Sequence, residues 1–458
     1  MSSEIVITRL FEDTISFEYR LIYVTSNGRE YTGRTISKSS DSGQSTRRSF
    51  LAASGAAGAL ALTAGCAGIT GSSGSDTLKM GVLEDQSGNL ALNGIQKYHA
   101  QKLAVEEINA DGGIDGQEIE MIAPDTQSDN QRYQELARRL INEDDVDILF
   151  GAQTSASREA IRPIIDENQQ FYIYTNQYEG GVCDTYTWCT GAVPEQQISP
   201  VLESLVEEYG ENIYTIAADY NFGQITASWY RQIADELGAN IMNEEFIPLD
   251  VSQFGSTINR IQEADPDLLV TLLVGNNHAS FYNQKNAAGL DVPMNTTVNM
   301  AQGYEHLRFD PPALTDMYVG VNYMQEIPTE RNRDFVDRFY ERWPDANYVG
   351  QMAQNSYFST YLYKNLVEKV GTTDQDELMA ELDREPLTVE APEGTVTTDP
   401  ETHHVTHQIR RARAGENHEI SFTEPTEVDP YWLSEGPGCD LTETTGASED
   451  EPMTQYTP

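Results

Sequence analysis

Cysteine and positive charge are both scarce in this sequence. Its 458 residues include 4 cysteines, and 29 lysines and arginines stand against 73 aspartates and glutamates, which gives a formal net charge of −44 at pH 7. Because nucleic acid is bound through a basic surface that neutralises its phosphates, this balance excludes nucleic acid as a partner. A dense carboxylate surface instead stays hydrated in concentrated salt, where ions screen its self-repulsion, so we expect a halophilic protein.

Motifs of enzyme active sites are missing as well. From residue 77 onward there is no G-x-S-x-G motif, no P-loop and no G-x-G-x-x-G after the first strand. The densest group of possible metal ligands is "HHVTH", with His403, His404 and His407. In a strand, His403 and His407 would share one face and His404 the other, and no cysteine lies nearby. We therefore expect a structural role for these histidines, no metal or other cofactor, and no enzymatic activity.

Apolar runs of membrane-spanning length, about 20 residues, are also lacking. The segment "STRRSFLAASGAAGALALTAGC" joins paired arginines, Arg47 and Arg48, to a short Ala- and Gly-rich run that ends at Cys66. It resembles a twin-arginine export signal followed by a lipobox, in which the thiol of Cys66 becomes lipid-modified. This pattern predicts a protein outside the cytoplasm, anchored to the outer face of the cell membrane by a lipid.

Strand-like and helix-like segments alternate through the rest of the chain. The strand-like run "TLKMGVL" at 77–83 precedes a helical pattern over 93–110, and "DILFG" at 147–151 follows another helical pattern. The rhythm starts again with "NIYTIAAD" at 212–219, before a helical pattern over 223–238. Such alternation predicts βαβ units with parallel sheets in two α/β lobes, and ligands of such folds bind at the carboxyl ends of the strands.

Several segments resemble a known family when read in order. "KMGVLEDQSGNLALNG" and "AVEEINADGGIDGQEIEMIAPDTQSD" resemble the opening of type I periplasmic binding proteins, the leucine/isoleucine/valine-binding superfamily. "GAQTSASREAIRPIIDE", "YEGG", "CTGAVPEQQ", "IAADYNFGQ" and "DPETHHVTHQIRRAR" resemble its branch of urea-binding and short-chain-amide-binding proteins. The resemblance covers Lys79 to Phe422. It implies two lobes joined by a three-crossover hinge, which close around one small molecule and deliver it to the permease subunits of an ABC importer.

The resemblance, together with the composition, divides the chain into segments. The expected divisions are an N-terminal extension with the export signal at 1–66, a Gly/Ser linker at 67–76, lobe I at 77–197 and 323–391, lobe II at 198–322 and 392–430, and an acidic disordered tail at 431–458.

Five residues of lobe I are predicted to touch the ligand. Ser155 stands at or next to a helix N-cap, and Gln153 offers an amide in the same loop. By resemblance, Tyr174 and Asn176 line the pocket, and the Asn176 amide both donates and accepts hydrogen bonds, as urea or an amide requires. Asp85, at the end of the first strand, either accepts from urea N–H groups or pairs with the ammonium of an amino acid.

Four further ligand-binding residues are predicted in lobe II. By resemblance, Tyr220 closes over the ligand, and Phe222 stands where relatives carry tyrosine. Asn276 and Gln302 lie at two other strand ends. Met300, Ala301 and Gln302 occupy the place where amino-acid receptors carry a carboxylate, which favours a neutral ligand. A receptor for branched-chain or other amino acids remains the alternative, and a secreted amide hydrolase is the third.

The cysteines allow more than one pairing. Cys183 and Cys189 are six positions apart in "CDTYTWC", a spacing that permits a small loop closed by a disulfide between them. We predict this disulfide, since disulfides persist outside the cell. Pairing of either with Cys439 is the rival, and the spacing argues against a redox or zinc site.

Overall fold

The computed structural model describes residues 22–24, 30–32, 77–274, 276–442 and 454–458. The chain divides into two units, residues 1–72 and 73–458. In the first unit, β1 (Ile22–Val24) and β2 (Glu30–Thr32) pair as an antiparallel hairpin. The predicted export signal, the linker and the lipidation site Cys66 lie outside the described residues.

Lobe I is built on a five-stranded parallel sheet. Its strands, in spatial order, are β4 (Ile119–Ile122), β3 (Leu78–Leu83), β5 (Ile148–Gly151), β6 (Tyr172–Tyr174) and β8 (Thr187–Cys189). One face is covered by α1 (Ala91–Ala110), α11 (Gln351–Val370) and α12 (Gln375–Arg384), and the other by α2 (Asn130–Asn142) and α3 (Ser155–Glu167). Successive side chains of β3 alternate between these faces: Val82 packs on the first and Leu83 on the second. Burial on both faces explains the continuous apolar runs of these strands.

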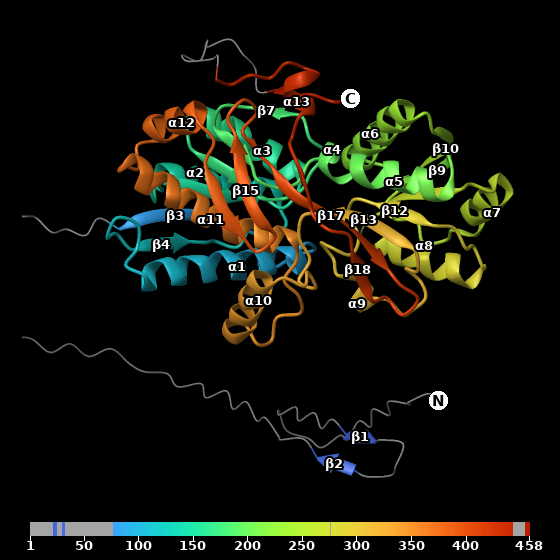
Figure 1. Ribbon diagram of the computed structural model, residues 1–458. Helices are drawn as coiled ribbons and strands as arrows, with labels where there is room; N and C mark the ends of the chain where they lie inside the picture. Colours follow the sequence, from blue (N-terminus) through green and yellow to red (C-terminus); the bar gives the residue numbers. More distant parts are fainter. Residues whose placement is uncertain (1–21, 25–29, 33–76, 275, 443–453) are drawn as a thin grey trace, which may run out of the picture. The chain divides into compact units, whose positions relative to one another are not determined.

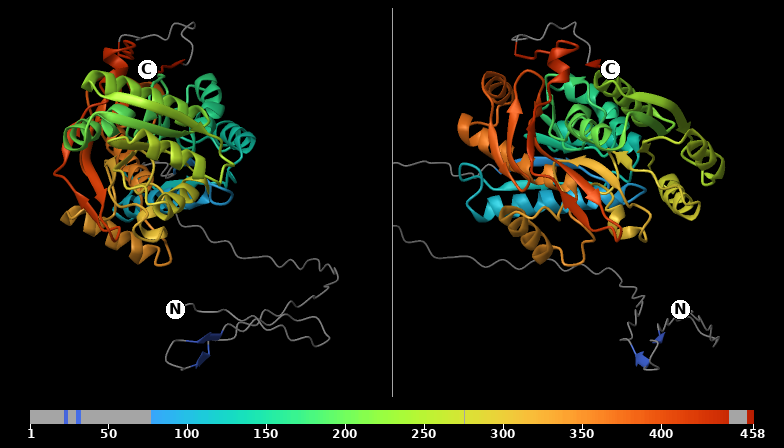
Figure 2. Two further views of the ribbon diagram at one scale, coloured as in Figure 1. Left: turned by 90° about the vertical axis from the view of Figure 1, so that its right-hand side faces the viewer. Right: turned by 45° about the vertical axis from the view of Figure 1, so that its right-hand side comes forward.

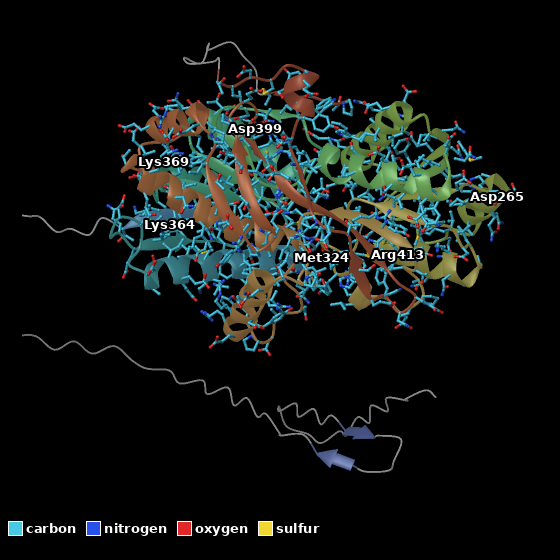
Figure 3. All side chains as sticks on the ribbon, viewed as in Figure 1. Asp265, Met324, Lys364, Lys369, Asp399 and Arg413 are labelled. Carbon is cyan, nitrogen blue, oxygen red and sulfur yellow. A yellow bond between two sulfur atoms is a disulfide. The ribbon has the colours of Figure 1, made fainter. Side chains whose placement is uncertain are left out.

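Lobe II has a larger, mixed sheet. Its strands, in spatial order, are β10 (Asn240–Ile247), β9 (Asn212–Ala218), β11 (Leu268–Leu272), β12 (Met294–Thr296), β13 (Met317–Val321), β17 (His407–Ala414) and β18 (Ile420–Phe422), and β19 (Thr426–Val428) also pairs with β17. One face is covered by α5 (Ser199–Tyr209) and α6 (Asn221–Leu237), and the other by α7 (Gly255–Ala264) and α8 (Asn276–Ala287). β17 joins antiparallel to β13, and its Arg413, labelled in Figure 3, forms an ion pair with Asp316 at 2.5 Å.

Figure 1 shows lobe I on the left and lobe II on the right, with β17 leading from between them into the second sheet. In the left view of Figure 2 the green and yellow elements of lobe II face the viewer. Further helices of this unit are α4 (Pro194–Gln197), α9 (Glu305–Arg308) and α10 (Glu330–Arg342). None of the helices in the described part of the chain is both long enough and apolar enough to cross a membrane.

The predicted boundary between residues 391 and 392 is wrong. β14 (Thr388–Ala391), β15 (Gly394–Asp399) and β16 (His404–Val405) form one antiparallel sheet. The apolar side chains of this sheet, among them Val396 and Val405, pack against Phe358 and Leu362 of α11, so residues 394–405 belong to lobe I. In Figure 1 β15 accordingly lies beside α11. The chain re-enters lobe II only at His407, the first residue of β17.

Three crossings join the lobes, as expected for a three-crossover hinge. They follow β8, β13 and β16, and Figure 3 places Met324, just after the second crossing, where the lobes meet. Buried Glu393 connects two of them: its Oε1 accepts from Asn322 Nδ2 at 2.9 Å and lies 3.1 Å from His407 Nδ1. Gln196, in the first crossing, donates from Nε2 to the Val405 carbonyl at 2.9 Å. The hinge is therefore a buried polar network and not only three covalent links.

The histidines of "HHVTH" are all engaged with protein groups. His403 Nε2 lies 2.8 Å from Asp383 and its ring stacks on Trp188, while His404 Nε2 lies 2.6 Å from the Tyr178 hydroxyl. The expected sharing of one strand face is wrong, because His403 precedes β16 in a left-handed conformation (φ 57°). Among the described residues, no group of three or more histidine, cysteine, aspartate or glutamate side chains is placed to hold a metal ion.

The predicted Cys183–Cys189 disulfide is wrong, and the rival pairing with Cys439 is the one present. Cys183 and Cys439 are bonded with their Cα atoms 6.1 Å apart. Cys189 is a free, buried thiol on β8, where it packs among the apolar side chains beneath α2 and α3, and burial raises its pKa to about 12. The predicted disorder of 431–458 is also wrong for the described residues 431–442 and 454–458. These include α13 (Trp432–Glu435) and β20 (Thr454–Gln455), which pairs with β7 (Val182–Cys183).

The hinge network generates a first prediction. Replacing Glu393 by alanine leaves the buried donors of Asn322 and His407 without their acceptor, so we expect the free energy of unfolding to fall by about 3 kcal/mol. Glu393→Gln keeps one acceptor oxygen and should cost less. Denaturant titration measures both, with exposed Glu416→Ala as the control. A Glu393→Ala protein as stable as the control would contradict a stabilising role of this network.

A second prediction concerns Glu195 of α4, whose carboxylate lies in the first crossing. It is 3% exposed, and burial raises its pKa from 4.5 to about 7. Since the folded protein then holds a proton that the unfolded chain releases, Glu195 favours folding at low pH, and this contribution is lost as pH rises from about 4.5 to 7. Glu195→Gln should gain about 2–3 kcal/mol relative to the native protein over that interval. Parallel pH-dependent unfolding curves for the two proteins would refute this.

Candidate functional site

The carboxyl ends of both sets of parallel strands meet at the first turn of α11. Gly350, which precedes this helix, donates its N–H to Gln96 Oε1 of α1 at 3.0 Å. The next N–H, of Gln351, donates to the carbonyl of Ala301 at 3.1 Å, in the lobe II loop after β12. This turn therefore touches both lobes and marks the inner end of the candidate site.

Gln153 and Asn176, two of the predicted residues, are brought together in lobe I. Asn176 Nδ2 donates to the Gln153 carbonyl at 2.5 Å, and Gln153 Nε2 lies 3.3 Å from Met352 Sδ on α11. Both side chains are buried: Asn176 is 0% exposed and Gln153 is 6% exposed. Asn176 Oδ1 and Gln153 Oε1 have no hydrogen-bond partner in the described part of the chain. Buried polar atoms are rarely left unpaired, so these two acceptors indicate a place for donors from a ligand or water.

Ser155 lies next to the N-cap, as predicted, but its hydroxyl is already used. The cap of α3 is Thr154, whose Oγ1 accepts the Ser157 N–H at 3.0 Å. Ser155 Oγ donates to Glu179 Oε2 at 2.5 Å. Ser155 therefore orients a carboxylate, and a role at the ligand would pass through that carboxylate.

Glu179 and Arg158 belong to the candidate site but were not among the residues predicted from the sequence. Glu179 is 2% exposed, Arg158 is fully buried, and they form an ion pair at 3.5 Å. The guanidinium also lies over the rings of Tyr174 and Tyr178, with its carbon 4.9 and 4.4 Å from their centroids, a cation–π arrangement. The signals were present: Glu179 is the acid of "QYEG", and Arg158 stands one helical turn after Ser155.

Tyr174 itself, another predicted residue, is 1% exposed and packs edge-on against Tyr178. Burial is the main cause that raises the pKa of its hydroxyl above the ordinary value. The ring of Tyr174 stabilises the Arg158 guanidinium through the cation–π contact.

Trp229 of α6 brings lobe II to the same residue, Glu179. Trp229 Nε1 donates to the Glu179 backbone carbonyl at 2.9 Å. Tyr220, the residue before α6, has a pKa raised first by burial of its hydroxyl and then by the charge of Glu179. Phe222 packs beside it with ring centroids 6.0 Å apart. The predicted pair Tyr220 and Phe222 thus lies at the N-terminus of α6, with Tyr220 exposed and Phe222 buried.

Asp85 has a role inside lobe I. Its Oδ1 accepts from Thr126 Oγ1 at 2.5 Å, Ser128 N at 2.7 Å and the Tyr133 hydroxyl at 3.0 Å, which fastens the loop before α2. Strand alternation sends the neighbouring Glu84 to the opposite face, towards α1.

Glu84 forms a buried ion pair with Lys97 of α1 at 2.8 Å. Lys97 also donates to the Ala152 carbonyl at 3.0 Å, which connects this pair to the loop that carries Gln153. Burial raises the pKa of Glu84 to about 7, against the opposing effect of Lys97. The charges of Glu84 and Lys97 therefore compensate each other next to the loop that carries Gln153.

The remaining lobe II residues are less closely placed. Gln302 is half-buried, and its Nε2 lies 3.5 Å from the Thr297 carbonyl. Asn276 begins α8, and its side chain lies outside the described residues. Its neighbour Asn277 is fully buried, with both amide atoms lacking a partner in the described part of the chain. Glu305, farther along, accepts the Met300 N–H at 2.6 Å and so fastens its own loop.

Residues 77–419 match the model of the periplasmic binding protein family. The chain belongs to this family. Solved structures share the fold: the branched-chain amino acid transporter substrate-binding protein LivJ of Streptococcus pneumoniae, in complex with isoleucine, gives a TM-score of 0.66 at 18% identity and covers 77% of this chain and 100% of that one. A solute-binding protein of an ABC transporter from Rhodopseudomonas palustris, in complex with 3,4-dihydroxybenzoic acid, gives 0.66 at 20% identity, over 77% and 98%. The type I fold expected from the sequence is confirmed.

Curated relatives match a smaller part of this periplasmic binding protein than the solved structures do. Leu/Ile/Val-binding protein homolog 7 of Brucella abortus is 25% identical over 229 residues, which are 47% of this chain and 57% of the relative. Homolog 8 of Brucella suis is 26% identical over 228 residues, 46% of this chain and 55% of the relative. The chain thus spans a little over half the length of these relatives.

The site of this periplasmic binding protein generates a third prediction. Arg158→Met leaves Glu179 buried without its cation, so we expect the free energy of unfolding to fall by about 3 kcal/mol. Glu179→Gln in the same protein should restore part of the loss, because the unpaired charge is then gone. Thermal unfolding of the two single variants and the double variant tests the coupling. Strictly additive effects would show that the pair does not act as a unit.

Proposed function

We propose that this protein is the substrate-binding component of an ABC importer and takes up urea or a short-chain amide. The observation that carries the proposal is the pair of buried, unpaired acceptors, Gln153 Oε1 and Asn176 Oδ1, in a site where Glu179 and Glu84 each have a buried cation. Two unpaired amide acceptors, on residues joined by a hydrogen bond, suit the N–H groups of a primary amide or of urea. Asn277 Nδ2 and Gln354 Nε2, both buried and unpaired in the described part of the chain, are donors suited to a carbonyl.

Charge pairing supports a neutral ligand over an amino acid. An amino acid brings an ammonium and a carboxylate, and each needs a buried partner of opposite charge or several hydrogen bonds. Glu179 is already bound by Ser155 and Arg158, and Glu84 by Lys97. An amino-acid receptor remains the second candidate, because the curated relatives are named for leucine, isoleucine and valine. No step of the proposal involves enzymatic turnover.

The cellular setting of the proposal follows from the sequence. The twin-arginine and lipobox-like segment supports export and a lipid anchor on Cys66, which would hold the protein at the outer face of the membrane near its permease. The net charge of −44 supports function in concentrated salt. We therefore expect a halophilic lipoprotein that binds its solute extracellularly.

Calorimetric titration in high salt tests the ligand, a fourth prediction. Urea or acetamide should bind and leucine should not. Asn176→Ala should weaken binding about tenfold, since one hydrogen bond in a dry site is worth about 1–1.5 kcal/mol. Asn142→Ala, at an exposed position on α2, is the matched control. Binding of leucine alone would establish the amino-acid receptor, and no heat with any of the three would contradict both candidates.

A further inference from the structure

The C-terminal segment after β19 contacts both lobes. On the lobe II side, Trp432 of α13 packs in a T-shaped contact with Trp229 of α6, with ring centroids 4.6 Å apart. The Tyr431 hydroxyl lies 3.5 Å from Ser199 Oγ of α5. Figures 1 and 2 show α13 and the C-terminus on the same side of the molecule, and Figure 1 places β7 beside α13. The beginning of the segment is thus attached to lobe II.

The rest of the segment is attached to lobe I. Cys439 is bonded to Cys183 of β7, and the Leu441 N–H donates to the Glu401 carbonyl at 2.8 Å. Residues 443–453 lie outside the described part, and the chain is described again at β20. β20 pairs antiparallel with β7, and the Tyr456 N–H continues the ladder with a bond to the Gly181 carbonyl at 2.7 Å. β20 thereby pairs with β7, a strand outside the main sheet of lobe I.

The strand pairing places one side chain at the candidate site. Gln455 Nε2 donates to Glu179 Oε1 at 2.8 Å and lies 3.1 Å from the Gly180 carbonyl. Among the described residues, the other group bound to Glu179 Oε1 is Arg158 at 3.5 Å, while Ser155 binds the other oxygen. Three separate parts of the chain, α3, α6 and β20, therefore meet at this one residue, and Gln455 supplies the shortest bond to Oε1.

We propose that residues 431–442 and 454–458 act as a strap across the two lobes, in which Gln455 is a positioning residue for Glu179 and the strap favours the arrangement of the lobes in this structure. A lobe rotation that separates Trp229 from Glu179 would also have to pull α13 away from lobe II or away from Cys439. The disulfide holds Cys439 to lobe I, so the contacts of α13 with Trp229 and Ser199 must break. Breaking them slows opening and so slows release of any bound solute.

The strap is tested without a ligand first. Tyr456→Pro removes the N–H that bonds to Gly181 and cannot join a ladder at that position. Spin labels on Glu263→Cys of α7 and Lys369→Cys of α11, both exposed, report the distance between the lobes. The native Cys189 does not interfere, because it is buried and its pKa is raised to about 12. Hydrogen exchange of residues 180–183 and 454–455 reports whether β20 is attached.

We expect Tyr456→Pro to speed hydrogen exchange at both segments. Trp432→Ala, which removes the ring contact with Trp229, and the Cys183→Ser and Cys439→Ser double variant, which frees the other end of the strap from lobe I, should each shift the lobe–lobe distances towards longer values. Thr457→Ala, an exposed change on the same segment, should match the native protein in both measurements. Unchanged exchange in Tyr456→Pro would overturn the attachment of β20, and unchanged distances in both Trp432→Ala and the disulfide variant would overturn the strap.

The experiments with ligand rest on the proposed function, but a failure of the proposed ligand can be distinguished from a failure of the strap. With urea or acetamide as the probe, Gln455→Ala and Tyr456→Pro should raise the dissociation rate about five- to tenfold and change the association rate less. Unchanged dissociation rates would overturn the positioning role of Gln455. If neither probe binds the native protein, the proposed ligand fails, and the distance and exchange measurements still decide the strap.

Discussion

Keeping buried carboxylates paired where the two lobes meet is the constraint on which this structure depends. Glu393 receives donors from Asn322 and His407, on two different crossings between the lobes. Glu179 is bound by α3 through Ser155, and its backbone carbonyl accepts from Trp229 of α6 in lobe II. An unpaired carboxylate in such a place would cost several kcal/mol, so each of these contacts also fixes the relative position of the parts that supply it.

The pattern of side chains predicted the fold well because it is a local property. Burial on both faces of a parallel sheet produces apolar strands, and helices covering those faces repeat apolar residues every three to four positions. The helices predicted over 93–110 and 223–238 are therefore present, as α1 and α6. The boundary at 391 failed because the valines of β15 and β16 signal a strand and do not say whether the strand packs on α11 or joins lobe II.

Long-range pairing explains the other errors. Cys183 lies six residues from Cys189 and 256 from Cys439, and spacing alone favoured the near partner. What decides the pairing is direction: Cys189 lies under α2 and α3, whereas Cys183 packs beside Leu433, Cys439 and Leu441 of the tail. The same holds for the site. Gln153 and Asn176 were recognised at strand ends, but the ion pair of Glu179 with Arg158 depends on how a loop after β6 folds back over α3.

Carboxylates of the acidic surface and carboxylates of the candidate site differ in whether a basic side chain pairs with them. With 73 acidic residues and 29 lysines and arginines, most carboxylates have no basic partner and must stay in water, where salt screens them. Near the site the opposite holds: Glu84 and Glu179 are each given a buried cation, Lys97 and Arg158. Two of the few basic residues thus neutralise buried carboxylates on the lobe I side of the candidate site. The amide oxygens of Gln153 and Asn176 are left without protein partners in the described part of the chain, and on this rests the proposal that the solute is a neutral, hydrogen-bonding molecule.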